Sequence, residues 1–337
     1  MRADEKLYTL ISLGIYALVT DMVSVNRLSM RLVKELMDNQ GEYRVKVEKL
    51  ACGATVIDTG LEVAGGYMAG LKLTEICLGG LARCWLTYQA YGDLELPAIV
   101  VATDHPALSL LGCQLAGWMV KVGDFFAASS GPARALALKP KKVFERIGYK
   151  DEHDEAVIVM ETSKKPTDEV AQRVAAECKV SPQNLYILLT TTASMAGSVQ
   201  VTGRVAETGL YRLEYLGLDP NRVVFASGSA PIMPPHPDAG VATAKEEDAL
   251  IYGGVGCYVI DEEDSKLTEY VSKAPATAWP DYGKTSYEAL KAVNFDWSKL
   301  DPSFFTIGKF VITSKRSGKT YIGGKVNPEV LRKALEL

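Results

Sequence analysis

The spacing of apolar residues predicts alternating helices and strands along most of the chain. Residues 25–37 carry apolar side chains at helical spacing, with Ser24 or Asn26 as the candidate N-cap. Residues 43–47 and 54–58 alternate or cluster as strands and are expected to pair as a hairpin. The other expected strands are 98–102, 155–160, 184–189, 223–226, 251–260 and 310–313, and the other expected helices are 107–118, 167–178, 197–216 and the tail from residue 327.

This alternation predicts an α/β fold with mixed α/β content. Residues 142–238 form the clearest strand–helix series, and the proline-rich stretch 231–238 indicates a boundary loop after it. We therefore expect two α/β domains. The first combines residues 22–141 with residues 239–337, and the second covers residues 142–238.

Residues 1–21 differ from the rest of the chain, and we interpret them as an N-terminal extension. The run of twelve apolar residues at 8–19 is too short to span a bilayer. Asp4 and Glu5 stand where a signal peptide carries positive charge, and no A-x-A cleavage site follows. Met22 is a second plausible start, so the extension is expected to be dispensable for activity.

Composition and charge narrow the range of partners. The 337 residues are 47% hydrophobic and 23% charged, with a formal net charge of −4. This balance is typical of a globular protein, and without a basic excess we expect no nucleic-acid and no membrane partner. The six cysteines form no C-x-x-C motif and lie in apolar context, which favours buried thiols in a reducing cytoplasm. With only three histidines, a histidine-rich metal site is not expected.

The most informative motif places Arg204 and Glu207 three residues apart at the start of a predicted helix. At that spacing the two side chains share one helix face. A carboxylate that a guanidinium keeps ionised is able to accept a proton from water. The spacing by itself favours an ordinary surface ion pair, which contributes only about 0.2–0.5 kcal/mol.

Several loops bring polar groups out of apolar elements. Asp104 and His105 follow a predicted buried strand, where the histidine is a base, a ligand contact or a structural imidazole. Residues 129–136 (SSGPARAL) resemble an anion cradle or a rigid turn with a surface Arg134. Residues 190–204 follow a strand and open a helix like a phosphate loop, but they lack its G-K-[ST] ending. Nucleotide hydrolysis is therefore disfavoured.

Longer motifs resemble one family, the archaeal methenyltetrahydromethanopterin cyclohydrolases. The resemblance covers nearly all of the chain from residue 22 onward. It rests on VSVN (23–26), GATVID (53–58), CLGGLA (77–82), TDHPA (103–107), GCQLAGW (112–118), SGPARALALKPKK (130–142), TASMAGSVQVTGRVAET (192–208) and PDYGK (280–284).

The resemblance implies a fold, a reaction and roles for individual residues. It implies a subunit of two α/β domains with a pocket between them, a homotrimer, and a reaction without metal or redox cofactor. The substrate is the cyclic amidinium cation of a methenyl pterin, which water opens reversibly to the N5-formyl pterin in archaeal one-carbon metabolism and methanogenesis. Glu207 matches the family's general base, and Arg204 would keep it ionised and position water.

The resemblance also suggests substrate contacts and exposes two departures. Ser130, Gly131, Arg134, Ser198 and Thr202 are candidate contacts to the distal phosphate of the pterin, and Asp104 and His105 are candidates for the pterin pocket. The first departure is Leu115, which stands where many members of the family place a lysine. The second is KEED (245–248), which replaces a more amide-rich segment, with only Asp248 aligned. A pterin- or phosphate-ligand-binding protein without turnover therefore stays open as an alternative.

Overall fold

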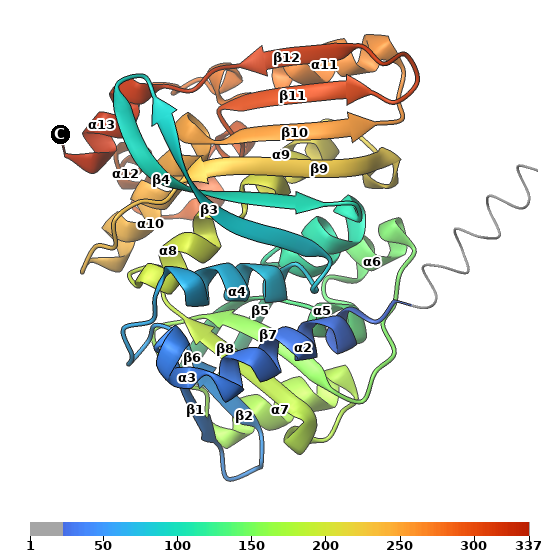
Figure 1. Cartoon of the computed structure of the whole chain (residues 1–337), viewed down its shortest axis with the longest axis vertical. Coiled ribbons are helices and arrows are strands. Elements are labelled where there is room, and N and C mark those ends of the chain that lie inside the picture. Colours follow the sequence, from blue (N-terminus) through green and yellow to red (C-terminus); the bar gives the residue numbers. More distant parts are fainter. Residues whose placement is uncertain (1–22, 337) are drawn as a thin grey trace, which may run out of the picture.

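The computed structural model describes residues 23–336, so the predicted extension 1–21 lies outside the described residues (Figure 1). The described chain forms two six-stranded sheets with helices packed on them, which confirms the α/β class. Its helices are α2 (Val25–Asp38), α3 (Gln40–Tyr43), α4 (Tyr67–Cys77), α5 (Ala133–Ala137), α6 (Lys141–Ile147), α7 (Asp168–Cys178), α8 (Met195–Thr202), α9 (Val205–Tyr215), α10 (Ala239–Asp248), α11 (Asp264–Lys273), α12 (Ser286–Ala292) and α13 (Pro328–Leu335). Shorter π- or 3-10 segments are η1 (Ala107–Gln114), η2 (Pro182–Asn184), η3 (Pro220–Arg222), η4 (Ala249–Gly253), η5 (Ala276–Ala278), η6 (Trp297–Lys299) and η7 (Pro302–Phe304).

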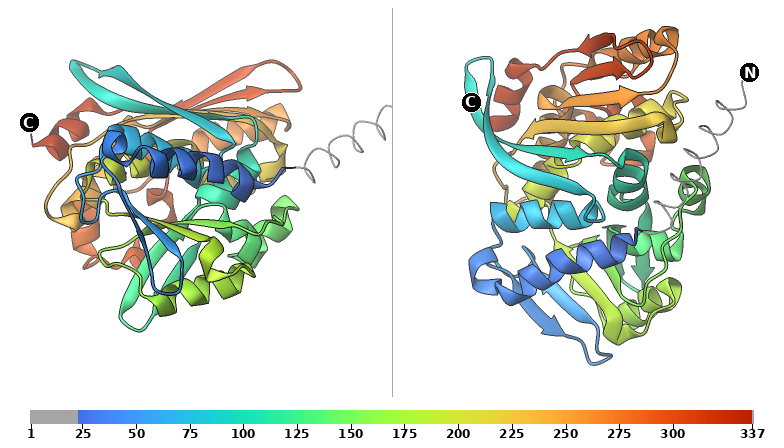
Figure 2. Two further views of the ribbon diagram at one scale, coloured as in Figure 1. Left: turned by 60° about the horizontal axis from the view of Figure 1, so that its bottom comes forward. Right: turned by 45° about the vertical axis from the view of Figure 1, so that its right-hand side comes forward.

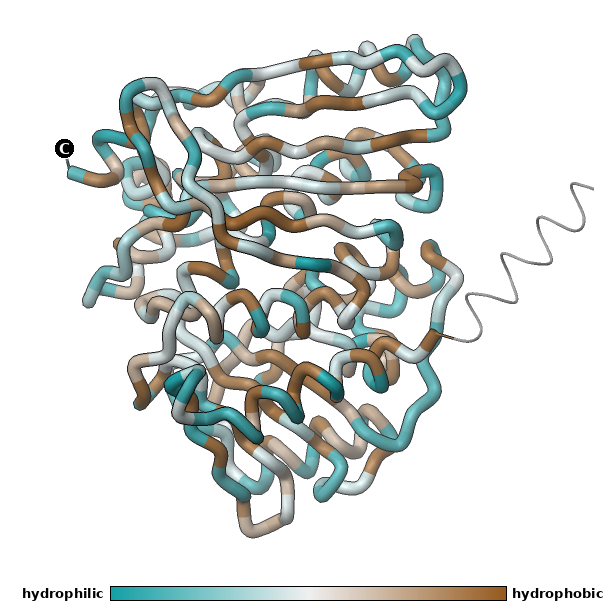
Figure 3. The backbone as a smooth tube through the Cα atoms, in the orientation of Figure 1, coloured by the Kyte–Doolittle hydropathy of each residue, from teal (hydrophilic) through white to brown (hydrophobic). Residues whose placement is uncertain are grey.

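The first sheet has the strand order β1-β2-β8-β7-β6-β5. Strands β2, β8 and β7 run parallel at its centre, and the flanking pairs are antiparallel. Alternate residues of the central strands pack on α2 and α4 on one face and on α5 and α7 on the other, so these strands are apolar throughout (Figure 3). Its strands are β1 (Lys46–Lys49), β2 (Thr55–Asp58), β5 (Trp118–Val122), β6 (Phe125–Ser130), β7 (Ala156–Glu161) and β8 (Leu185–Thr190).

The second sheet has the order β12-β11-β10-β9-β4-β3. Only β10 and β11 are parallel in it. Helices α9 and α11 pack on one face, and in Figure 1 they lie behind the sheet; within residues 23–336 no helix covers the face turned to the viewer (Figures 1 and 2). Its strands are β3 (Ala82–Tyr91), β4 (Leu94–Thr103), β9 (Val223–Pro231), β10 (Val255–Ile260), β11 (Lys309–Ser314) and β12 (Thr320–Gly324).

Strand pairing divides the chain differently from the predicted domain boundaries. The segment 142–238 contributes β7 and β8 to the first sheet but β9 to the second. The segment 22–141 likewise supplies strands to both sheets. Pairings such as β4 with β9 join residues more than a hundred positions apart, and local periodicity carries no signal of them.

Most predicted elements are present, and the differences have local causes. Helix α2 is capped by the Ser24 side chain, which accepts from the Arg27 N–H, whereas Asn26 is fully buried. The predicted hairpin of β1 and β2 is confirmed. The predicted helix 107–118 ends as the π-helix η1 at Gln114, because Trp118 already belongs to β5. Strands β3, β5 and β6 were not predicted, since their mixed polar and apolar residues gave no clear period.

Arg134 is an internal support of this fold rather than a surface residue. It is fully buried, and burial lowers the pKa of its guanidinium to about 10, so it stays charged at neutral pH. Its Nη1 donates to the carbonyl oxygens of Leu111 (3.1 Å), Gly112 (2.8 Å) and Cys113 (3.3 Å), and its Nε donates to that of Lys139 (2.8 Å). The arginine therefore satisfies carbonyls at the C-terminal end of η1.

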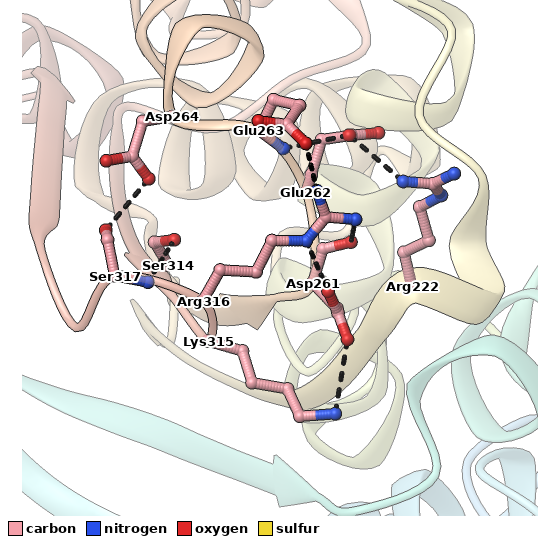
Figure 4. A network of polar contacts seen from close by, with 9 residues as sticks. All are labelled: Arg222, Asp261, Glu262, Glu263, Asp264, Ser314, Lys315, Arg316 and Ser317. Carbon is pink, nitrogen blue, oxygen red and sulfur yellow. Dashed lines mark hydrogen bonds and ion pairs between the residues drawn. The ribbon is translucent and has the colours of Figure 1, made fainter. Parts of the chain in front are cut away.

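A network of charged groups lies at the end of the second sheet where β10 and β11 stop side by side (Figure 4). Asp261 accepts from Arg316 Nε at 2.6 Å and pairs with Lys315 at 3.3 Å, while Arg222 pairs with Glu262 at 3.0 Å. These groups are exposed or half-buried, so each pair contributes little and salt screens it. None of the helices between residues 23 and 336 combines the length and apolar composition needed to cross a membrane.

Replacing Arg134 by methionine is expected to lower the free energy of unfolding by on the order of 3 kcal/mol, because it leaves buried carbonyls without donors. Urea denaturation at one fixed protein concentration measures the loss. Lys142→Met removes an exposed basic residue nearby and should change stability little. Equal stability of the two variants would contradict a structural role for Arg134.

Candidate active site

A cavity of about 850 Å³ lies between the two sheets. The ends of β7 and β8 form one wall, α8 and α9 another, and α10 with the segment 290–305 closes the remainder. Its polar lining includes Glu161, Thr162, Ser163, Thr191, Thr192, Arg204, Glu207, Thr208, Tyr211, Thr243 and Glu247. A cavity of this size, mostly apolar with a few converging polar groups, is typical of a small-molecule site.

The predicted helix 197–216 is broken at Gly203 and Arg204, and this break positions the charged pair. Helix α8 ends at Gly203, where a side chain would come within 2.6 Å of the Thr74 side chain. Arg204 is then the N-cap of α9, and Glu207 lies in the first turn of that helix. The positive end of the helix dipole favours a carboxylate there. Both side chains consequently reach the same cavity wall.

The Arg204–Glu207 pair is buried, so it is not an ordinary surface ion pair. Arg204 Nη1 lies 3.7 Å from Glu207 Oε2, and the two side chains are only 13% and 6% exposed. The same Nη1 donates to the carbonyl oxygen of Gln114 at 2.8 Å, and Nη2 donates to Ser130 Oγ at 3.4 Å. The guanidinium is therefore fixed by the fold before any ligand binds.

The protonation of Glu207 differs from the expectation of a fully ionised carboxylate. Burial raises its pKa to about 7, and the charges of Arg204 and Arg134 oppose that rise only in part. Near neutral pH the carboxyl is therefore divided between its acid and base forms. A group poised in this way both accepts and donates protons at low cost, as a general acid–base catalyst requires.

Two further carboxyl groups in the cavity were not predicted from the sequence. Glu161 ends β7 and accepts a hydrogen bond from the Thr192 hydroxyl beyond β8. Glu247 extends from α10. Glu161 had a usable signal, because it ends a buried strand and ligands gather at the carboxyl ends of parallel strands. Glu247 lay in a charged run that resembles any solvated helix face.

Aromatic side chains supply much of the apolar lining. Tyr211 comes from α9 and Phe126 from β6, and three more come from the segment beyond α12. Those three are Phe295, Trp297 and Phe305. Aromatic walls of this kind suit a planar ring ligand through offset or edge-to-face contact. The segment 295–305 lies about ninety positions from Glu207 in sequence, so its proximity was not predictable from local patterns.

The other residues expected to bind substrate lie elsewhere. Asp104 and His105 are exposed at the end of β4 and do not line the cavity. Ser198 Oγ donates to the Met233 carbonyl at 2.7 Å, and Thr202 Oγ1 donates to the Ser198 carbonyl at 2.8 Å, so both hydroxyls are engaged inside the fold.

Three remaining candidates, at the end of β6 and in the stretch that follows it, act as supports. Arg134 donates to backbone carbonyls, as described above. Gly131 has a φ of +98° and packs against the backbone of β7. Ser130 is 2% exposed and reaches Arg204 rather than the cavity. Leu115 does line the cavity, so the position that departs from the expected lysine faces the site.

Comparison with known proteins agrees with the resemblance seen in the motifs. The model of the cyclohydrolase (MCH) family matches residues 24–335. The methenyltetrahydromethanopterin cyclohydrolase of Methanocaldococcus jannaschii is 45% identical over 318 residues, covering 93% of this chain and 98% of that protein. The proteins of the same name from Methanothermobacter marburgensis and Methanococcoides burtonii are 43% and 41% identical, over 94% and 92% of this chain and 100% and 97% of theirs. The chain therefore belongs to the methenyltetrahydromethanopterin cyclohydrolase family.

Proposed function

We propose that the protein hydrolyses the cyclic amidinium of N5,N10-methenyltetrahydromethanopterin, reversibly, to N5-formyltetrahydromethanopterin in archaeal one-carbon metabolism. Relatives of that name match over nearly the whole chain. The observation that carries the proposal is the buried Arg204–Glu207 pair facing a cavity of about 850 Å³. Methanogenesis is the metabolic setting that we propose with it.

The reaction needs orientation and one acid–base group. The carbon between N5 and N10 is electrophilic, because the cation spreads its charge over the N–C–N bridge. In the proposed mechanism Glu207 in its base form takes a proton as water adds to that carbon, and it then returns the proton to N10 as the C–N10 bond breaks. Arg204 holds the water and donates to the oxygen of the adduct.

The lining of the cavity suits a cationic, planar substrate. Glu161, Glu207 and Glu247 face it, and within the described lining Arg204 is the basic side chain. Aromatic rings supply flat apolar contacts for the pterin. Because the substrate is already an activated cation, we propose that neither a metal nor a redox cofactor is required.

Two features favour the alternative function, a pterin-binding protein without turnover. Leu115 lines the cavity, where a lysine would have added a positive charge. The hydroxyls and the arginine that were expected to bind a phosphate are also engaged within the fold. The poised Glu207 argues for turnover, since buried carboxyl groups whose pKa is shifted toward neutral pH are typical of general acid–base catalysts.

We further propose a cytoplasmic homotrimer whose subunits meet through the uncovered face of the second sheet. Residues that alternate with the core positions turn to this face, among them Trp85, Val100, Cys257, Val311 and Ile322. Trp85 and Ile322 are 46% and 61% exposed. Apolar side chains on several strands of one uncovered sheet face are typical of an interface with another copy of the chain.

Glu207→Gln is expected to keep pterin binding but to lower kcat by about 10²–10⁴-fold, because the amide cannot exchange the proton. The decay of the methenyl absorbance measures turnover, and fluorescence quenching measures binding. Glu214→Gln changes the same residue type on the same helix, outside the cavity lining, and should stay near the wild-type rate. Equal rates for both variants would remove Glu207 from the mechanism.

The pH dependence of kcat/KM is expected to follow the ionisation of Glu207 in the free enzyme. The base form acts, so kcat/KM falls as pH drops below about 7 and levels off above it. Arg204 lowers that pKa, so Arg204→Gln should move the falling limb to higher pH besides slowing turnover. Arg173→Gln, an exposed change on α7, serves as control. If the falling limb of the pH profile stayed at the same pH in Arg204→Gln, Arg204 would have no influence on the ionisation of Glu207.

Sedimentation equilibrium is expected to give three times the 36.5 kDa of one chain. Val311→Asp places a charge in the middle of the uncovered sheet face and should shift the mass toward that of one chain. A trimer that withstands this change would place the interface elsewhere.

A further inference from the structure

The mechanism so far uses neither Glu161 nor Glu247, the two other carboxyl groups in the described lining of the cavity. Glu247 extends from α10 into the same cavity as Glu207. In residues 23–336 no hydrogen bond or ion pair engages its side chain, whereas Glu161 is held by Thr192 and Glu207 by Arg204. Unlike Glu207, which is 5% exposed, Glu247 is half-buried and so keeps contact with solvent.

The proton balance of the reaction calls for a second acceptor. The adding water carries two protons, one of which ends on N10 while the other is released. Glu207 accounts for the first, since it takes that proton at addition and returns it to N10. When the C–N10 bond breaks, the hydroxyl of the adduct must lose the second proton as the formyl C=O forms. At that moment Glu207 is donating its own proton, so a different base serves the step best.

We propose that Glu247 is a second catalytic carboxylate, which takes the hydroxyl proton of the tetrahedral adduct as the ring opens and passes it to solvent. The proposal rests on the cyclohydrolase function proposed above. No oxidant, reductant or further reactant enters. The O–H bond breaks as the C=O bond forms, the C–N10 bond breaks as the N10–H bond forms, and one proton leaves through Glu247.

The surroundings of Glu247 fit an intermediate proton carrier. Burial raises its pKa to about 7, with Asp248, Glu161 and Glu207 adding to the rise and Arg204 opposing it. Arg204 thus influences both carboxyl groups, and each is able to hold or release a proton near neutral pH. Glu247 is also more exposed than Glu207, which favours exchange of its proton with water.

The neighbouring Glu246 provides a matched control. It is 2% exposed, does not line the cavity, and has one carboxyl oxygen without a partner among the described residues. Burial, with the charges of Glu161 and Glu247 adding to it, raises the pKa of Glu246 well above its ordinary value and so favours the neutral acid. Glutamine is close in shape to a neutral glutamic acid, and Glu246→Gln is therefore expected to leave turnover nearly unchanged.

The test compares turnover of the methenyl substrate by the full chain in wild-type form and with Glu247→Gln or Glu246→Gln, at increasing concentrations of imidazole buffer. Glu247→Gln should lower kcat by about 10–100-fold, less than Glu207→Gln, because water replaces the lost acceptor poorly. Imidazole should raise kcat of Glu247→Gln but not of the wild type. Glu207→Gln, blocked at the earlier step, should not respond.

A second variant and two further results also decide the role of Glu247. If the glutamine variant melts early, Glu247→Ala with added formate provides the same rescue test in a smaller side chain. Turnover of Glu247→Gln equal to wild type, or slow turnover that no buffer base improves, would overturn the assignment while leaving the cyclohydrolase function intact. A wild-type protein that fails to open the substrate would overturn the proposed function and this inference with it.

Discussion

A carboxyl group buried beside a guanidinium, at a break between two helices, is the interaction on which the site depends. Desolvation pushes Glu207 toward its neutral form, and Arg204 pulls it back toward the charged form. Desolvation outweighs the arginine and leaves the pKa of Glu207 at about 7, so the group exchanges protons readily around neutral pH. If α8 and α9 were one continuous helix, the pair would not be set at this corner of the cavity wall.

Hydrogen bonds around the Arg204–Glu207 pair keep it in place. Arg134 satisfies the carbonyls of residues 111–113 at the end of η1, and the next carbonyl, that of Gln114, accepts from Arg204. The Gln114 amide in turn donates to the Gly203 carbonyl at the helix break. Arg134, which resembled a phosphate ligand in the sequence, thus supports the segment whose next carbonyl, that of Gln114, holds Arg204 of the catalytic pair.

The sequence indicated the charged pair of the site, but not how deeply the pair is buried or which segments surround it. The spacing of Arg204 and Glu207, the class of fold and most central strands followed from local patterns and motifs. The depth of the pair did not, because α9 packs on η1, β9 and β10 and Arg204 bonds Gln114 and Ser130, none of which local spacing connects to it. Asp104 and His105 looked functional after an apolar strand, yet that strand directs them to the surface.

The most direct test of this account is an infrared titration of the Glu207 carboxyl, taken as the difference between wild-type protein and Glu207→Gln across the pH range. The protonated-carboxyl band is expected to be half lost near pH 7. A carboxyl that is already half ionised near its ordinary value of 4.5 would contradict it, because a group in that state is neither desolvated nor poised to return a proton to the departing nitrogen.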